Sequence, residues 1–127
     1  MSIKKILIIM IILSLTITAV SAASGLDEIV RIAEANGYHC AESYVDDTGT
    51  NMLNFTKGSE KLFIAYANES TVLMDTSMGF EKKTINNTEG IYKEDSSGYY
   101  FDYNHGKDAV LIKATDKGMI EKLALGN

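Results

Sequence analysis

Two histidines, His39 and His105, are the candidate bases for nucleophilic catalysis in this 127-residue chain. A serine or cysteine nucleophile needs such a base within hydrogen-bond reach. His39 precedes Cys40, but neighbouring residues of a strand point to opposite faces, which disfavours a dyad between the two side chains. His105 falls in a predicted hairpin turn, where polar residues are common. We predict no catalytic residue and keep a small hydrolase that uses His105 as an alternative.

Acidic residues allow two further kinds of chemistry. A pair of carboxylates held at a defined separation cleaves glycosides, and Glu42 and Asp46 share one strand parity. Solvated acids on the outside of a sheet explain the same spacing without chemistry. The segment 46–51 groups oxygen donors around Gly49, but it lacks the alternating ligands and the distal glutamate of a calcium loop. We expect no metal and no cofactor, and a hydrolase that uses carboxylates stays open.

Aromatic residues between positions 92 and 103 are the best candidates for a binding surface, because tyrosine offers flat apolar area with a polar tip. Strand alternation predicts that Tyr99, Phe101 and Tyr103 face the core, while Tyr100 shares the other face with Asp102. The residues that we predict to bind a ligand are Tyr92, Tyr100, Asp102 and His105.

Three Asn-x-Ser/Thr triplets, which begin at Asn54, Asn68 and Asn86, are candidate N-glycosylation sites. Asn54 has the strand parity opposite to that of Leu53 and Phe55, so we expect it to face solvent. The other two lie at or near predicted turns. Occupancy requires a host that has the modification pathway.

Apolar residues at helical spacing predict a helix over residues 24–36, which Gly37 ends. A second helix is expected over 117–125, with Thr115 or Asp116 as its N-cap. Between these helices, short runs rich in Tyr, Phe, Val, Ile and Thr alternate with Gly, Asn, Asp and Ser clusters, which predicts strands joined by tight turns. The eight predicted strands cover residues 38–46, 52–57, 60–67, 71–75, 80–85, 90–94, 99–104 and 109–115.

The strand pattern also predicts the fold. Without helices between the strands, a parallel sheet would lack its crossover connections, so sequential antiparallel pairing is favoured. The run 60–67 is apolar in both phases, which is typical of a central strand. The side chains that we expect on the core side are those of Leu53, Phe55, Tyr99, Phe101, Tyr103, Val110 and Ile112. The predicted fold is a two-layer α+β domain, an antiparallel β-meander of about five to eight strands with both helices on one face.

The first 22 residues predict export. Lys4 and Lys5 precede an apolar run over residues 6–20, and small residues follow it, so we expect cleavage after Ala22 or Ala23. Residues 1–22 are then a signal peptide and residues 23–127 a single domain that is secreted or at the cell surface. An uncleaved segment that tethers the chain to the membrane is the alternative.

The exported part is acidic. Residues 1–22 hold two of the twelve basic residues and none of the seventeen acidic ones, so a net charge of −7 remains after cleavage. This balance argues against nucleic acid as a partner, and against anionic membrane surfaces unless the N-terminus stays attached. Cys40 is the sole cysteine, which excludes an intrachain disulfide, and we expect it to be a small buried apolar residue.

The stretch Thr84–Tyr92, followed by Tyr99–Asn104, the Gly106 turn and Val110-Leu111-Ile112, resembles small secreted domains of unknown function from methanogenic archaea. The resemblance covers the C-terminal part of the chain. It implies an extracytoplasmic location and supplies no active-site residue.

Export, an acidic surface and strand-borne tyrosines favour a secreted or cell-surface, non-enzymatic binding domain. We expect its partner to be another protein, a cell-wall polymer or a small ligand, bound at the open face or at an edge of the sheet. The alternatives are a small exported hydrolase and a membrane-tethered accessory protein. The hydrolase predicts a concave pocket with convergent ionisable groups.

Overall fold

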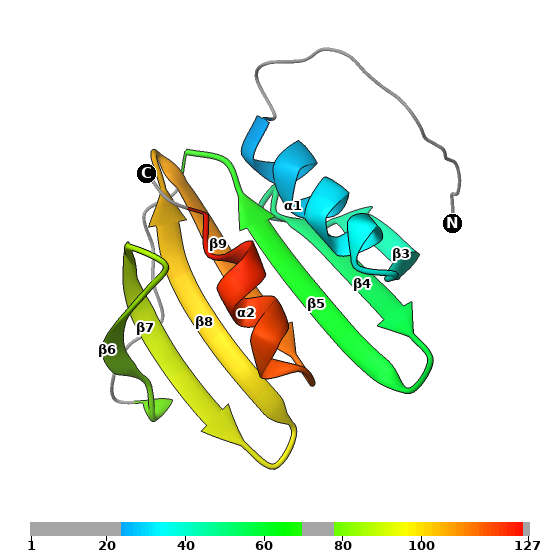
Figure 1. Cartoon of the computed structure of the whole chain (residues 1–127). Helices are drawn as coiled ribbons and strands as arrows, with labels where there is room; N and C mark the ends of the chain where they lie inside the picture. The colour runs from blue at the N-terminus through cyan, green and yellow to red at the C-terminus, as the bar shows by residue number, and fades with distance from the viewer. Residues whose placement is uncertain (1–23, 70–77, 126–127) are drawn as a thin grey trace.

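The described part of the chain contains one antiparallel sheet of seven strands and two helices (Figure 1). The computed structural model describes residues 24–69 and 78–125. The predicted signal peptide and the strand predicted at 71–75 lie outside these residues. Neither of the two described helices is long and apolar enough to cross a bilayer. The α+β class and the antiparallel pairing predicted from the sequence are confirmed.

Seven of the predicted strands are present, with bounds within two residues of those expected. The elements are α1 (Ser24–Ala35), β3 (His39–Val45), β4 (Asn51–Lys57), β5 (Glu60–Ala67), β6 (Glu81–Ile85), β7 (Thr88–Asp95), β8 (Gly98–His105), β9 (Asp108–Ala114) and α2 (Lys117–Leu123). Asp116 caps α2, because its Oδ1 accepts a hydrogen bond from Gly118 N at 3.0 Å.

The strand order is β3-β4-β5-β9-β8-β7-β6, so pairing is not sequential throughout. One meander runs from β3 to β5 and a second from β6 to β9, and the two meet where β5 pairs with β9. The prediction of a single meander is therefore wrong at the connection from β5 to β6. The physical reason is apolar pairing, since Leu62 and Ile64 of β5 lie opposite Ala114 and Ile112 of β9 in the middle of the sheet.

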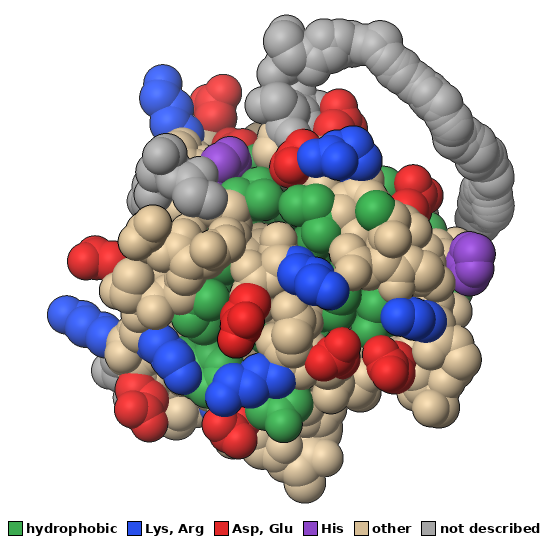
Figure 2. Space-filling model, viewed as in Figure 1, with side chains coloured by type: hydrophobic (Ala, Val, Ile, Leu, Met, Phe, Trp, Pro, Cys, Tyr) green, Lys and Arg blue, Asp and Glu red, His purple; other side chains and the backbone are tan. Residues whose placement is uncertain are grey.

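Alternate strand residues point into one core, and we call the face that they share the inner face. Six of the seven side chains expected there are buried, and Tyr99 packs against them half-buried. Ile29 of α1 and Ile120 of α2 join the same core, and α2 packs against β8, β9 and α1. On the side of the molecule that Figure 2 shows, positive and negative side chains are interspersed, with apolar ones between them.

Candidate binding face of the sheet

The opposite face of the sheet, which we call the outer face, presents the strand residues that alternate with those of the core. One line of side chains crosses six strands in register on this face. From β3 to β7 its members are Glu42, Asn54, Phe63, Lys113, Tyr100 and Lys93, each the direct partner of the next. We call them the outer row. Because neighbouring strands lie about 4.8 Å apart, the row extends over roughly 24 Å.

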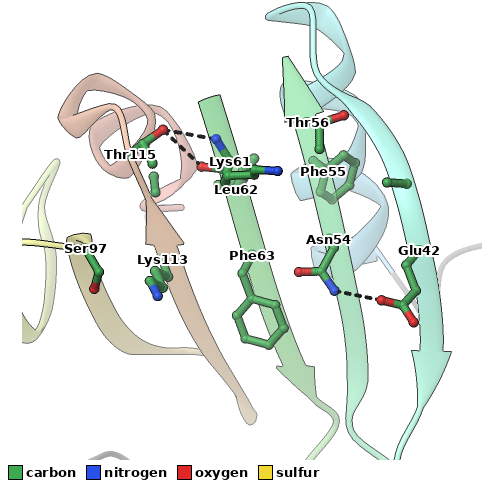
Figure 3. A pocket seen from close by; sticks show the side chains of 12 residues that line it. Glu42, Asn54, Phe55, Thr56, Lys61, Leu62, Phe63, Ser97, Lys113 and Thr115 are labelled. Atoms are coloured by element: carbon green, nitrogen blue, oxygen red, sulfur yellow. Dashed lines mark hydrogen bonds between the residues drawn. The ribbon is translucent and has the colours of Figure 1, made fainter. Parts of the chain in front are cut away.

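A hollow of about 690 Å³ opens on the outer face over β3, β4, β5 and β9 (Figure 3). Phe63 lies over its middle, with Lys113 on one side and Asn54 and Glu42 on the other. Phe63 is half-buried, whereas its neighbour Ile64 points into the core and is 0% exposed. Asn54 Nδ2 donates to Glu42 Oε1 at 3.3 Å. The hollow thus offers an aromatic ring between an ammonium group and an amide.

Hydrogen bonds between β5 and β9 fix one end of the hollow. Thr115 N donates to Lys61 O at 3.1 Å. Thr115 Oγ1 accepts from Lys61 N at 3.0 Å and donates to Lys61 O at 3.4 Å (Figure 3). Because hydrogen bonds hold the Lys61 backbone on both sides of its Cα, they fix the position from which its exposed side chain extends at the rim of the hollow.

Tyr100 organises the cations next to the hollow. Lys93 Nζ and Lys113 Nζ each lie 5.4 Å from the centre of its ring, within the range of cation–π attraction. Phe80 meets the ring edge-on, with 6.1 Å between ring centres. The Tyr100 hydroxyl lies 2.7 Å from Ser97 Oγ. These contacts fix the ring and keep both ammonium groups beside it.

The turn between β7 and β8 places Ser97 for this contact. Asp95 Oδ1 accepts hydrogen bonds from Ser97 Oγ and Ser97 N, both at 2.8 Å, and these bonds lower the pKa of Asp95. Gly98 follows with φ +143°, and a Cβ there would lie 2.6 Å from Ala114 O. A glycine is therefore required for the hairpin to lie this close to the end of β9.

Three lysines make this part of an acidic chain locally positive. Lys93 Nζ lies 3.8 Å from Asp95 Oδ2, at the limit of an ion pair. Within the described residues, Lys61 and Lys113 form no salt bridge. Glu42 is the one carboxylate in the outer row, and it stands at the opposite end from Lys93.

The structure does not gather the four predicted binding residues at one site. Tyr100 belongs to the outer row. Asp102 lies on the same face, as alternation predicted, but it is only 4% exposed, between Ile91 of β7 and Leu111 of β9. The outer face is therefore partly apolar, because these two neighbours and Phe63 are apolar.

The other two predicted binding residues lie elsewhere. Tyr92 is on the inner face and 6% exposed, with Lys83 Nζ 4.2 Å from the centre of its ring. His105 ends β8, half-buried beside Gly25 of α1, and its buried Nδ1 has no hydrogen-bond partner among the described residues. Ser97, which lines the hollow, directly precedes β8, whereas His105 is the last residue of β8. This histidine is therefore remote from the hollow.

His39 and Cys40 point to opposite faces, since they pair with Thr56 and Phe55 respectively. The expectation that Cys40 is buried is wrong, because β3 is an edge strand whose seven residues are all exposed. Partial desolvation of the sulfur nevertheless raises the pKa of Cys40, and its thiol contacts Glu42 O at 3.4 Å. A protonated thiol is a poor nucleophile.

The acidic turn at 46–51 uses its first carboxylate internally. Asp46 Oδ1 accepts from Thr48 Oγ1 at 2.7 Å, from Thr48 N at 2.9 Å and from Thr50 N at 3.0 Å, and these bonds lower the pKa of Asp46. Among residues 24–69 and 78–125, no three His, Cys, Asp or Glu side chains are grouped so that they could hold a metal ion.

The three candidate glycosylation sites differ in accessibility. Asn68 is exposed in the turn after β5. Asn54 is half-buried and lines the hollow. Asn86 adopts φ +56° in the turn after β6, and its Nδ2 donates to Glu121 O at 3.3 Å and to Ala124 O at 3.4 Å. Asn68 is thus the acceptor whose amide the described fold leaves most accessible.

Sequence reasoning missed Phe63, Lys93 and Lys113 as parts of one surface. The parity of Phe63, opposite to that of Leu62, places it on the outer face. No local signal places Lys113 beside it, because that contact depends on the pairing of β5 with β9 across a long stretch of chain.

Comparisons with protein-family models, with curated proteins and with solved structures find no match.

Proposed function

We propose that this chain is an exported, non-enzymatic domain that binds an extended ligand across the outer face of its sheet. The observation that carries the proposal is the outer row, in which a half-buried aromatic ring lies in register between amide and ammonium groups. The proposal includes cleavage of the signal peptide and the placement of both helices on the inner face, which leaves the outer face open to a ligand.

The position of the row favours side-chain recognition of a polymer over peptide addition at an edge. β4, β5 and β9 each pair on both sides, so their backbone groups already have partners. A ligand on this face meets side chains only, and a row of roughly 24 Å suits a chain of repeating units better than one small molecule.

The chemistry of the hollow favours binding over hydrolysis. Its described lining includes a single carboxylate, Glu42, whereas glycoside hydrolysis uses two carboxyl groups about the scissile bond. His105, the other candidate acid or base, lies at the far end of β8 from Ser97.

The test is a binding screen of the protein secreted by an exporting host against a panel of cell-wall polysaccharides. We expect Phe63→Ala to weaken binding of the recognised polymer by about tenfold, since buried aromatic anchors dominate such interfaces. Tyr44→Ala is the control for position within the outer face, because Tyr44 is an exposed aromatic of edge strand β3 that pairs with Met52 on this face but lies outside the outer row.

Equal binding by wild type and Phe63→Ala would contradict the proposal. A loss confined to Tyr44→Ala would move the site from the outer row to the β3 edge of the sheet and would contradict it as well. The mass of the secreted protein tests export. A mass that begins at Met1 would favour the membrane-tethered alternative.

A further inference from the structure

We propose that the outer row binds an acidic polysaccharide, a chain of sugar rings that carry carboxylate groups. The inference rests on the proposed function, because it names the ligand class for the same face. Such a ligand presents an apolar ring face and a negative charge within one repeating unit. Their complements, Phe63 and Lys113, are direct cross-strand partners.

The charge distribution supplies the first argument. The exported chain carries a net charge of −7, yet the outer row holds two lysines and one glutamate, and Lys61 adds a third ammonium group at the rim of the hollow. Asp95, whose Oδ2 lies 3.8 Å from Lys93 Nζ, offsets one of these three charges, and Lys61 and Lys113 keep the hollow positive. Lys61 and Lys113 form no salt bridge with a described residue, so both charges are available to a ligand. A polyanion repelled by the rest of the surface is attracted to this patch.

The restricted side-chain mobility of two of the lysines supplies the second argument. Lys93 and Lys113 both contact the ring of Tyr100, and Ser97 and Phe80 fix that ring. Because these lysines are already held, they lose less side-chain conformational entropy on binding than unsupported lysines would. This loss of entropy is one of the main costs of association. Tyr100 is in this account a positioning residue for the two cations.

Polar groups of the hollow supply the third argument. Asn54, Thr56, Ser97 and Thr115 offer amide and hydroxyl groups, which donate and accept hydrogen bonds. Sugar hydroxyls need both kinds of partner. Glu42 at the end of the row adds an acceptor for hydroxyl groups while it stays away from the lysines that receive the carboxylates.

Two other polyanions fit less well. An acidic peptide binds best through backbone hydrogen bonds at a free strand edge, and the hollow lies over strands paired on both sides. A nucleic acid requires a basic domain to release its counterions, and the chain is strongly acidic.

The experiment is calorimetric titration of the secreted protein with oligogalacturonate and with its methyl ester, which has the same rings without the charge. We expect the acid to bind about tenfold or more tightly than the ester, and its affinity to fall as salt is added. Lys93→Gln/Lys113→Gln should remove most of this preference. Lys122→Gln is the matched control, since Lys122 of α2 donates to Asn36 Oδ1 at 2.9 Å, outside the row.

The possible results separate this inference from the proposed function. If the acid and the ester bind equally and Phe63→Ala weakens both, the inference that the ligand is acidic is overturned. The proposed function would stand, with a neutral polymer as the ligand of the same face. No binding of either oligosaccharide would also overturn the inference. Binding of dextran sulfate as tight as that of oligogalacturonate, with Phe63→Ala without effect, would indicate charge attraction alone and overturn both.

Discussion

Gly25 of α1 lies directly against the hydroxyl of Tyr66 in β5: a Cβ built on Gly25 would come 2.0 Å from Tyr66 Oη and 3.0 Å from His105 Cδ2. Tyr66 Oη in turn donates to Asp108 Oδ2 at 2.5 Å, and Asp108 Oδ1 accepts from Glu69 N at 2.8 Å. This contact fixes where α1 begins over the sheet.

Gly25→Ala should therefore destabilise the protein by about 1–3 kcal/mol through overpacking. Removal of the hydroxyl in Tyr66→Phe relieves the clash, so the two substitutions should be less destabilising together than their separate effects predict. Urea unfolding measures all three variants. Gly118→Ala in α2, where a Cβ meets ordinary contacts at 3.4 Å or more, should be neutral or slightly stabilising. Additive effects of Gly25→Ala and Tyr66→Phe would contradict the contact.

Tyr103→Phe should lower stability by about 1–3 kcal/mol, because it leaves one buried and one part-buried backbone group without this partner. The Tyr103 hydroxyl donates to Leu123 O at 2.6 Å and accepts from Leu125 N at 3.3 Å, which ties the end of α2 to β8. Thermal unfolding should show a fall of roughly 4–8 °C per kcal/mol. Tyr99→Phe, on the same strand and face, is the control. A Tyr103→Phe protein as stable as Tyr99→Phe would show that this tie contributes nothing.

Stability should fall as pH rises above about 10, the pKa of an ordinary tyrosine. Burial raises the pKa of Tyr38, Tyr66 and Tyr103, and burial together with Glu94 raises that of Tyr92 to about 12. Since the unfolded chain loses these protons first, the stability present below pH 10 is lost as pH rises through the folded-state values. Urea midpoints measured against pH test this, and Tyr92→Phe should show a shallower decline. A midpoint constant up to about pH 11 would be inconsistent with these shifts.

In a host whose glycosylation acts on folded chains, Asn68 should be the occupied acceptor. It is exposed, while the amide groups of Asn54 and Asn86 already form hydrogen bonds within the fold. Glycopeptide mass spectrometry assigns the sites, with Asn68→Gln as the control. Modification at Asn54 would place a glycan in the hollow and block the outer face, so its detection would contradict the assignment of this face as a binding site.

Local patterns predicted the elements and the two faces of the sheet. Alternation placed Phe101 and Tyr103 in the core, and glycine marked the hairpins at Gly58 and Gly106, both of which adopt φ +62°. These features depend on periods of two residues and on turn geometry, which a single sequence records.

The outer row could not be predicted in the same way, because it depends on which distant strands pair. Lys113 meets Phe63 only because β9 lies between β5 and β8, whereas the sequence pattern favoured sequential pairing. Cys40 was misjudged for a related reason. Composition says that cysteine is commonly buried, but the strand order puts β3 at an edge, where burial is lost.

The most direct test of the outer-face site is nuclear magnetic resonance mapping of backbone amides during titration with oligogalacturonate. The account predicts chemical-shift changes that gather at Asn54, Phe63, Tyr100 and Lys113 and that require about tenfold more ligand in Phe63→Ala. Changes confined to the helices or to the edge strands β3 and β6, or no changes at all, would contradict it.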